Sequence, residues 1–187
     1  MRVGVLALQG AFAEHLKVLS KLGVEGFQVK KPVDLAQGLD ALIIPGGEST
    51  VMGKLLKEIG LYGPIKTLID GGLPVLGTCA GMILLASAIE NDNTVHFGTL
   101  PITVRRNAFG RQLGSFHTVG EFAGIPDIPM TFIRAPVITK ADDSVVVLAT
   151  VGAHMVAARR GNILVTAFHP ELTDDPTVHK FFLEHLI

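Results

Sequence analysis

The sequence predicts an α/β fold: an open, three-layer, flavodoxin-like mixed sheet with helices on both faces and a β-rich C-terminal half. Two observations predict it. In the N-terminal half, short apolar runs alternate with amphipathic helical stretches, which is typical of a parallel sheet whose strands are connected by helices. From Gly98 onward, the chain breaks into short β-rich pieces with the spacing of hairpins, which is typical of antiparallel strands.

In the N-terminal half, the apolar run at residues 3–8 predicts a strand buried on both faces. Apolar residues at helical spacing over residues 12–22 predict the helix that follows it. The other expected elements are strands near residues 24–29, at 41–44 and at 74–77, a helical region over 50–69 broken near 60–64, and a helical run at 82–88.

In the C-terminal half, strands are expected at residues 99–105, 130–134, 144–150, 154–159 and 163–168. A tight turn is predicted at residues 160–162, Arg-Gly-Asn. Residues 120–129 contain two prolines and two glycines, which predict a surface loop. The last element is a helix over 176–186, with a proline at its permitted first position.

Composition limits the possible functions. The length of 187 residues predicts one domain over residues 1–187. The composition, 48% hydrophobic and 18% charged, predicts a folded chain and not a disordered one. A net charge of -1 gives no electrostatic reason to expect nucleic acid or an anionic membrane as a partner. The apolar run at 3–8 is too short for a secretory signal, and no run is long enough to span a membrane. A single cysteine excludes an internal disulfide, so we expect a cytoplasmic protein.

A sharp turn from strand to helix is predicted around Cys79. This residue lies in the motif Gly-Thr-Cys-Ala-Gly at 77–81, between the expected strand and the expected helical run. The motif matches a nucleophile elbow with cysteine in place of serine, because only glycines leave room beside such a turn and the central side chain is pushed into solvent. The dipole of a helix N-terminus also favours a thiolate. The alternative is a buried cysteine that acts as a small apolar residue.

A thiolate nucleophile needs a base, and the base needs an orienting partner. The motif His-Pro-Glu at 169–171 supplies both directly after an expected strand. Groups that follow parallel strands gather at one edge of an open sheet, so His169 and Glu171 are expected to meet Cys79 there. Solvated or structural roles are expected for His15 and His179, in polar parts of helices, and for His185; His96, His117 and His154 stay open.

The motif Pro-Gly-Gly-Glu-Ser-Thr at 45–50 follows another expected strand. Two adjacent glycines let the backbone approach a ligand and turn a peptide N–H inward, as an oxyanion hole requires. A phosphate loop does not fit, because Glu48 and Leu55 stand where that motif needs glycine and a hydroxyl residue. A plain turn followed by a helix capped by Ser49 is the remaining alternative.

No cofactor or metal is expected. One cysteine and scattered histidines give no zinc-like spacing, and no Gly-x-Gly-x-x-Gly motif follows the first strand. Two arginines, Arg106 and Arg134, have planar side chains that could hold a substrate carboxylate. The alternative for each is an exposed arginine without a function.

Together, the motifs at 45–49, 77–81 and 169–171 resemble those of the class I, or triad, glutamine amidotransferases. The whole chain is similar to the glutaminase subunits of pyridoxal 5'-phosphate synthase. The motifs that carry this narrower resemblance are Leu-Ala-Leu-Gln-Gly at 6–10, Gly-Gly-Glu-Ser-Thr at 46–50, Thr-Cys-Ala-Gly-Met-Ile-Leu-Leu-Ala at 78–86, Arg-Asn-Ala-Phe-Gly-Arg-Gln at 106–112, Phe-Ile-Arg-Ala-Pro at 132–136 and Phe-His-Pro-Glu-Leu-Thr at 168–173.

The resemblance implies that Cys79 is the nucleophile of a triad completed by His169 and Glu171, which hydrolyses L-glutamine through a γ-glutamyl thioester. The implied glutamine contacts are Gly46, Gly47, Glu48, Arg106, Ile133 and Arg134, and the oxyanion hole is assigned to Gly47 and Ala80. The implied partner is the synthase subunit, a TIM barrel that receives the ammonia within a large hetero-oligomer.

The segment Gly-Ser-Phe-His at 114–117 departs from the family, where acidic residues are expected on either side of Ser-Phe. This departure leaves the triad untouched and concerns the surface that faces the partner. Two alternatives stay open. One is a glutaminase that serves another synthase or acts alone as a γ-glutamyl hydrolase. The other is a non-catalytic α/β module whose cysteine is oxidised as a redox sensor.

Overall fold

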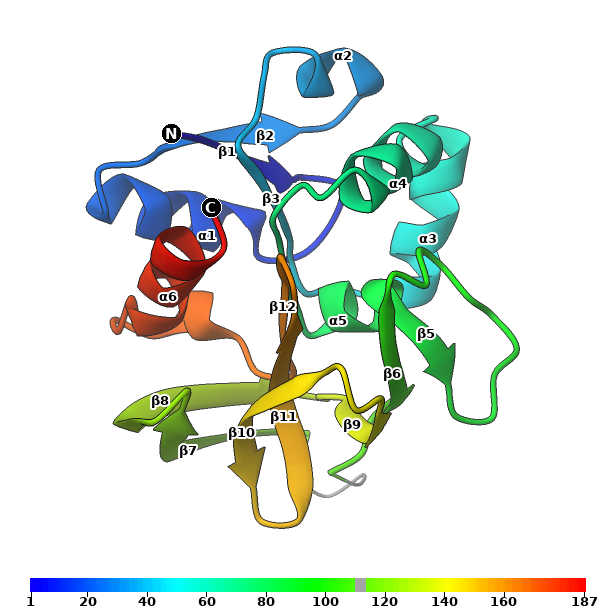
Figure 1. The fold of residues 1–187 in the computed structure, drawn as a ribbon. Coiled ribbons are helices and arrows are strands. Elements are labelled where there is room, and N and C mark those ends of the chain that lie inside the picture. Colours follow the sequence, from blue (N-terminus) through cyan, green and yellow to red (C-terminus); the bar gives the residue numbers. More distant parts are fainter. Residues whose placement is uncertain (110–113) are drawn as a thin grey trace.

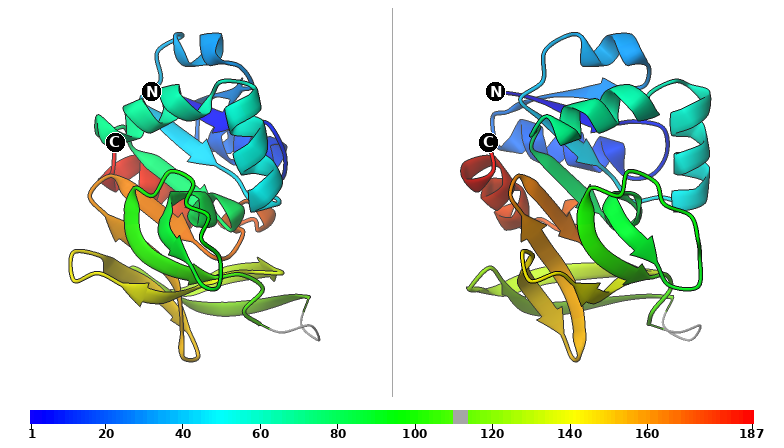
Figure 2. Two further views of the ribbon diagram at one scale, coloured as in Figure 1. Left: turned by 90° about the vertical axis from the view of Figure 1, so that its right-hand side faces the viewer. Right: turned by 45° about the vertical axis from the view of Figure 1, so that its right-hand side comes forward.

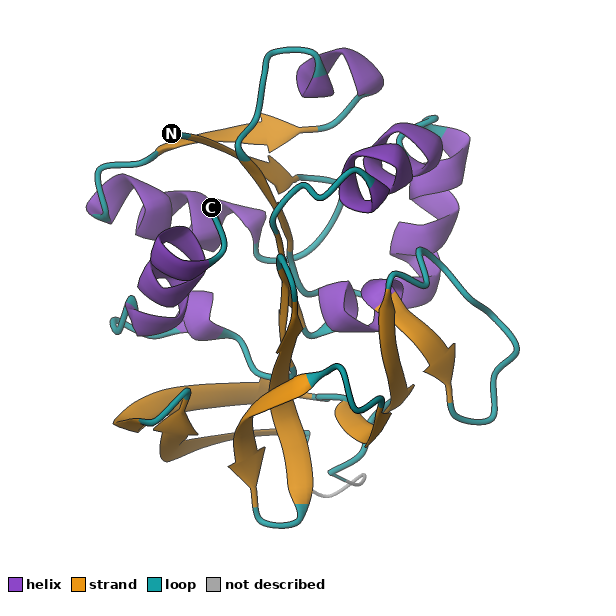
Figure 3. Ribbon diagram, in the orientation of Figure 1, coloured by secondary structure: helices purple, strands orange, loops and turns teal. Residues whose placement is uncertain are grey.

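The computed structural model describes residues 1–109 and 114–187, which form a large mixed β-sheet with helices on both faces (Figures 1 and 3). The helices are α1 (Phe12–Lys21), α2 (Pro32–Leu35), α3 (Ser49–Glu58), α4 (Tyr62–Asp70), α5 (Ala80–Leu85), the 3₁₀ helix η1 (Pro170–Leu172) and α6 (Thr177–His185). The strands are β1 (Arg2–Leu6), β2 (Glu25–Val29), β3 (Ala41–Ile44), β4 (Val75–Thr78), β5 (Ala86–Ile89), β6 (Leu100–Arg105), β7 (Ser115–Phe122), β8 (Ile125–Ile133), β9 (Val137–Ala141), β10 (Val146–Val151), β11 (His154–Arg160) and β12 (Ile163–Thr166).

The parallel part of the sheet has the strand order β2-β1-β3-β4-β12. This order matches the flavodoxin-like pattern, in which the first strand lies inside the sheet. Helices α1 and α6 cover one face, and α3, α4 and α5 cover the other (Figure 1). The predicted three-layer α/β fold is therefore confirmed, and strands β1 to β4 each lie within two residues of the expected positions.

The sheet continues from β12 through antiparallel neighbours in the order β11-β9-β6, and β5 completes that edge parallel to β6. Strand β10 pairs with β11, while β7 and β8 form a separate hairpin. Figure 2 shows these β-rich elements gathered at one end of the molecule. The expected β-rich C-terminal half is therefore confirmed.

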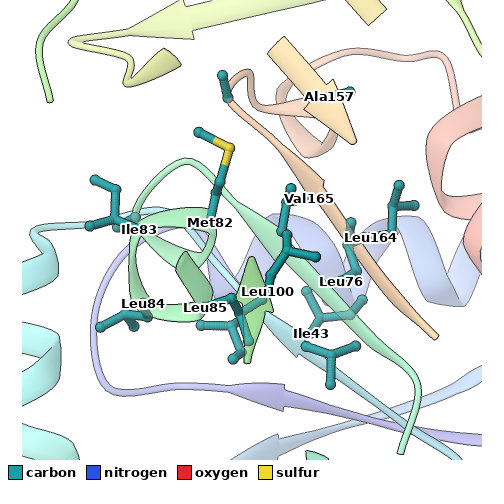
Figure 4. Close-up of a cluster of buried hydrophobic side chains, with 14 of the residues drawn as sticks. Ile43, Leu76, Met82, Ile83, Leu84, Leu85, Leu100, Ala157, Leu164 and Val165 are labelled. Carbon is teal, nitrogen blue, oxygen red and sulfur yellow. The ribbon is translucent and has the colours of Figure 1, made fainter. Parts of the chain in front are cut away.

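The core between the sheet and α5 fixes the position of the predicted nucleophile. Side chains of β3, β4 and β12 meet those of α5 and β6 in one apolar cluster (Figure 4). All six residues of α5 are buried. Each fully buried leucine, isoleucine or methionine contributes about 1.5–3 kcal/mol to stability, so this short helix is anchored by packing.

Two predictions were wrong. The helical run expected at 82–88 ends at Leu85, because residues 86–89 pair with β6 as strand β5. Pairing with a neighbouring strand here overrides the helical propensity of the alanines. The surface loop expected at 120–129 is instead the end of β7 and the start of β8. Both strands of a two-stranded sheet are edges, where prolines are tolerated.

The tight turn expected at 160–162 is confirmed, because Arg160 pairs with Ile163 and leaves Gly161 and Asn162 as a two-residue loop. The turn between β7 and β8 is equally short, since Phe122 pairs with Ile125. Over residues 1–109 and 114–187, no helix is long and apolar enough to cross a membrane.

Candidate active site

The carboxyl ends of β1, β3, β4 and β12 meet at one edge of the sheet, where the residues that follow them line a cavity of about 430 Å³. Ligands bind at this edge in open α/β sheets. The lining residues are Gln9, Gly10, Ala11, Gly46, Gly47, Glu48, Ser49, Cys79, Ile83, Arg106, Asn107, Ile133, Arg134, Pro136, His169 and Leu172.

Cys79 occupies the predicted elbow between β4 and α5. Its backbone has a φ of 50°, in the left-handed region that non-glycine residues rarely adopt. A side chain on Gly81 would overlap the carbonyl oxygen of Ile44, and a Cβ on Gly77 would lie 2.7 Å from the nearest atom of Leu85. The glycines on either side of the turn are therefore required sterically. The expectation that the side chain of Cys79 is pushed into solvent is contradicted. Cys79 is only 6% exposed, and it lines the cavity.

His169 and Glu171 follow β12, the strand next to β4. The backbone N–H of Cys79 donates to Thr166 of β12 over 2.7 Å, which ties the two strand ends together. The imidazole Nδ1 of His169 is hydrogen-bonded to Oε1 of Glu171 at 2.8 Å. Both residues are at least 94% buried. This bond leaves Nε2 as the ring nitrogen free to serve Cys79, which is the arrangement of a base held by a carboxylate.

Contacts among Cys79, His169 and Glu171 stabilise the charged forms of His169 and Glu171. Burial acts to lower the pKa of His169, but hydrogen bonds to Cys79 and Glu171 outweigh burial and raise the pKa to about 10. Burial acts to raise the pKa of Glu171, but the nearby His15 and the hydrogen bond to His169 bring the pKa below its ordinary value. At neutral pH, His169 is therefore an imidazolium beside a carboxylate, the form that stabilises a neighbouring thiolate.

The two glycines after β3 lie against His169, and a side chain on Gly46 would overlap its ring. The next peptide is held by Gln9, whose Oε1 accepts from the N–H of Glu48 over 2.9 Å. Glu48 also caps α3, because its carboxylate accepts from the N–H groups of Thr50 and Val51. The alternative in which Ser49 caps this helix is contradicted, because Glu48 is the capping residue and Ser49 is the buried first residue of α3.

Both arginines predicted for substrate binding line the cavity. Arg106 Nη2 lies 3.0 Å from Oδ2 of Asp92, and its Nε is buried without a hydrogen-bond partner among the described residues. Arg134 follows β8 with a φ of 43°. The last three residues of the motif at 106–112 lie outside the described part of the chain.

The segment that departs from the family leads into β7. There His117 Nδ1 is hydrogen-bonded to Oγ1 of Thr131 at 2.9 Å, and the carbonyl of Thr131 accepts from the backbone N–H of His169 over 2.8 Å. The segment that departs from the family is therefore linked to His169 through Thr131. Its effect is not confined to the surface.

The structure brings most of the predicted residues to one place. Eight of them line the cavity: Gly46, Gly47, Glu48, Cys79, Arg106, Ile133, Arg134 and His169. Glu171 lies behind His169, and Ala80 is buried as the first residue of α5. Their roles stay predictions. Within residues 1–109 and 114–187, no three histidine, cysteine or carboxylate side chains are placed to hold a metal ion.

Sequence reasoning missed three neighbours of the site. Gln9 lay in a motif used only for the resemblance, although it follows β1 as Cys79 follows β4. His15 and His179 were assigned to the polar parts of their helices, but both are fully buried. The signal for His15 was its spacing of three and four residues from the apolar Val18 and Leu19.

Comparison with known proteins agrees with this geometry. The model of the SNO glutamine amidotransferase family matches residues 5–187. The chain is 54% identical to the pyridoxal 5'-phosphate synthase subunit PdxT of Streptococcus pneumoniae, covering 98% of this chain and 96% of that protein. It is 52% identical to the protein of the same name from Haemophilus influenzae, covering 98% and 97%.

A solved structure described as a glutamine amidotransferase superposes with a TM-score of 0.92 at 46% identity and covers 97% of both chains. The family match spans nearly the whole sequence, and the matched part contains the elbow, the His-Pro-Glu motif and the glycine pair. The chain therefore belongs to the SNO glutamine amidotransferase family.

Proposed function

We propose that this chain is the glutaminase subunit of a pyridoxal 5'-phosphate synthase, which hydrolyses L-glutamine to L-glutamate and ammonia and delivers the ammonia for vitamin B6 synthesis. Family membership and the relatives named PdxT support this function. One observation carries the chemistry: Cys79 and the hydrogen-bonded pair of His169 and Glu171 lie at neighbouring strand ends beside one cavity.

In the first step, the thiolate of Cys79 attacks the side-chain carboxamide carbon of glutamine. The developing oxyanion accepts hydrogen bonds from the backbone N–H groups of Gly47 and Ala80. The imidazolium of His169 then protonates the amide nitrogen, the C–N bond breaks, and ammonia leaves. A γ-glutamyl thioester remains on Cys79.

In the second step, His169 is neutral and takes a proton from a water molecule that attacks the thioester carbonyl. The C–S bond breaks and releases L-glutamate, and the Cys79 thiolate and the His169 imidazolium are restored. Glu171 keeps the imidazole in one orientation and stabilises its charged form throughout.

The cavity has charges suited to the two ends of an amino acid. The guanidinium of Arg106 or Arg134 would hold the α-carboxylate of glutamine. The carboxylate of Glu48 would hold the α-ammonium group, because each of its oxygens has a second lone pair beyond the helix-capping bond. Gly46, Gly47 and Ile133 complete the proposed glutamine contacts.

The partner is the synthase subunit, which we take to be a TIM barrel within a large hetero-oligomer. Ammonia released at Cys79 would then pass to that subunit. The single cysteine is free, and a free thiol nucleophile suits the reducing conditions of the cytoplasm, where we place the protein.

The test measures glutamate release from glutamine by the purified chain, with and without a pyridoxal 5'-phosphate synthase subunit, beside a Cys79→Ala control. We expect release that depends on the partner and disappears in the variant, with little activity in the isolated chain. Release that needs a different synthase would identify another amidotransferase. No release with any partner, together with reversible oxidation of Cys79, would favour a redox sensor.

A further inference from the structure

Two buried histidines lie beside the triad and have no role in the chemistry described above. His15 belongs to α1 and His179 to α6, the two helices that cover the same face of the sheet (Figure 1). Both side chains are 0% exposed. Burying an imidazole away from water costs free energy unless its nitrogens have partners. The contacts of this pair therefore indicate what the histidines do.

His15 lies between His179 of α6 and the candidate active site. Its Nδ1 is hydrogen-bonded to Nε2 of His179 at 2.9 Å. Its Nε2 lies 3.3 Å from Oγ1 of Thr78, the residue before Cys79, and 3.5 Å from Oε2 of Glu171. One imidazole thus contacts both the elbow and the carboxylate of the triad.

The two carboxylate oxygens of Glu171 have different surroundings. Its Oε1 is bonded to His169, whereas Oε2 is fully buried and has no hydrogen-bond partner among the described residues. A buried carboxylate oxygen needs a donor or a cation nearby. His15 Nε2 lies 3.5 Å from this oxygen and can supply an N–H to it.

The protonation states follow from the same contacts. Burial lowers the pKa of His15. Burial, followed by repulsion from His15 whenever that ring is protonated, lowers the pKa of His179 to about 3. Both rings are therefore neutral at pH 7. Each neutral ring has one N–H. If His15 carried it on Nδ1, His179 would bury an N–H on Nδ1 with no acceptor in the described chain, and a lone pair of His15 would face a carboxylate.

The other arrangement avoids both costs. His179 Nε2–H donates to His15 Nδ1, and His15 Nε2–H points at Oε2 of Glu171 and Oγ1 of Thr78. The donors then run in one direction, from α6 through α1 to the carboxylate, while His169 approaches the carboxylate from the other side.

We propose that His15, itself oriented by His179, is a positioning residue of the triad that holds Glu171 in place from the side opposite His169. The inference rests on the proposed glutaminase function for its kinetic consequence. In this role, His15 touches neither the substrate nor the reacting atoms. Its effect is to keep the carboxylate ionised and fixed, and through it the imidazolium of His169.

The polar and titratable groups in and around the cluster of His15, His179 and Glu171 come from four elements. They are Glu14 and His15 of α1, Thr78 with Cys79 at the end of β4, His169 and Glu171 around η1, and His179 of α6. A second cavity, of about 270 Å³, lies beside Glu171 and is lined by Glu14, Lys17, Lys21 and Asp174 among others. Removing the N–H of His15 destabilises the ionised carboxylate, so the cluster should take up a proton at higher pH.

The experiment compares His15→Phe, His15→Gln and His179→Phe with a matched control, His185→Phe, which makes the same change at an exposed position of α6. Phenylalanine keeps the ring and loses both hydrogen bonds. Glutamine restores an N–H near the position of Nε2. Each variant is assayed for glutamate release with the synthase subunit over a range of pH, and for the pH dependence of Cys79 alkylation by iodoacetamide in the isolated chain.

We expect His15→Phe to lower kcat roughly 10- to 100-fold, the usual loss for a donor to a buried charged group, with KM nearly unchanged. The acid limb of both pH profiles should move to higher pH. His15→Gln should recover most of kcat and return the limb, His179→Phe should show a smaller loss, and the control should match the parent chain.

The two readouts separate this inference from the proposed function. Activity and alkylation profiles of His15→Phe that match the parent chain would overturn the positioning role. If the parent chain released no glutamate but the alkylation profile still moved in His15→Phe and returned in His15→Gln, the positioning role would stand and the glutaminase function would fall. A thermal melt of each variant identifies one that fails to fold, in which case His15→Gln and His179→Phe decide.

Discussion

Gly46 lies so close to His169 that a methyl group on the glycine would overlap the imidazole ring. The variant Gly46→Ala should therefore push the ring away from Cys79. A displacement of about 1 Å can cost about 10²-fold in rate, so we expect a loss of that order in kcat for glutamate release. The matched control is Gly63→Ala in α4, where a Cβ meets nothing within 4 Å. This control should keep its activity, and equal activity of the two variants would contradict the prediction.

Glu171→Gln keeps the size of the side chain and removes its charge. The amide can no longer stabilise the imidazolium of His169, and it favours the wrong tautomer of the ring. By analogy with carboxylate loss in other triads, kcat should fall by about 10³- to 10⁴-fold. The control is Asp174→Asn, which changes a fully exposed carboxylate nearby and should have no effect on kcat. A loss below tenfold in Glu171→Gln would argue against the triad.

The free energy of unfolding should depend on pH through His169. Because its pKa rises from 6.5 to about 10 on folding, the folded state binds the proton more tightly. This stabilisation is complete below about pH 6.5, declines between 6.5 and 10, and is absent above 10. Glu171 contributes with the opposite sign, since its lowered pKa gives stability that is lost on acidification.

Thermal unfolding of the isolated chain and of His169→Gln, measured from about pH 6 to 10.5, checks the contribution of His169. This range spans both the ordinary pKa of a histidine and the raised pKa of His169. The difference in Tm between the two proteins should shrink as the pH rises. A constant difference across this range would show that His169 is not protonated on folding.

The ion pair of Arg106 with Asp92 should set the affinity for substrate. Arg106→Lys keeps the charge but loses the planar fork that matches a carboxylate. We expect KM for glutamine to rise by roughly tenfold, a value typical of one lost charged hydrogen bond, while kcat changes less. Asp92→Asn should raise KM to a smaller extent, because the guanidinium stays present but is less well oriented. Unchanged KM in both variants would remove Arg106 from the binding site.

The β7–β8 hairpin contains an unfavourable residue. Ala123 has a φ of 54° and Gly124 a φ of 80° in the two-residue turn, and such turns favour Asn-Gly. Ala123→Asn should therefore recover part of the roughly 1–2 kcal/mol that a left-handed residue costs, seen as a higher free energy of unfolding in urea. Gly124→Ala should destabilise it through backbone strain alone, since a Cβ there meets nothing within 4 Å. A loss of stability in Ala123→Asn would contradict this reading.

The parallel part of the fold could be predicted because each buried strand is a continuous apolar run. Residues 41–44 form β3 as expected, and the helix over 12–22 begins at the expected residue. Strands β5, β7 and β9 were not predicted. Strands β5 and β9 both pair with β6, which is not adjacent to either of them in a tight hairpin, whereas β7 pairs with β8 directly after a two-residue turn. Strand β7 alternates exposed and partly buried residues and contains a glycine, so its own pattern is weak.

The site was predictable where its signals are local. The glycine pair, the elbow and His169 each follow a strand of the parallel sheet, and such strands deliver their ends to one edge. The contact of His15 with His179 joins residues 164 positions apart. Histidine counts as polar in a hydropathy pattern, so neither ring was assigned to the core. The capping role of Glu48 was also missed, because Ser49 is the commoner capping residue type.

The pairing of β4 with β12 has a consequence for synthesis of the chain. Thr78 and Thr166 are neighbours in the sheet although they lie 88 positions apart, so the proposed nucleophile and its proposed base belong to a contact of high sequence separation. Such contacts form late, because a long loop must close first. A nascent chain on the ribosome would thus carry Cys79 without a base until its last strand emerged. Topology would thus delay the proposed hydrolysis of glutamine until synthesis is nearly complete, in addition to the expected dependence on the partner.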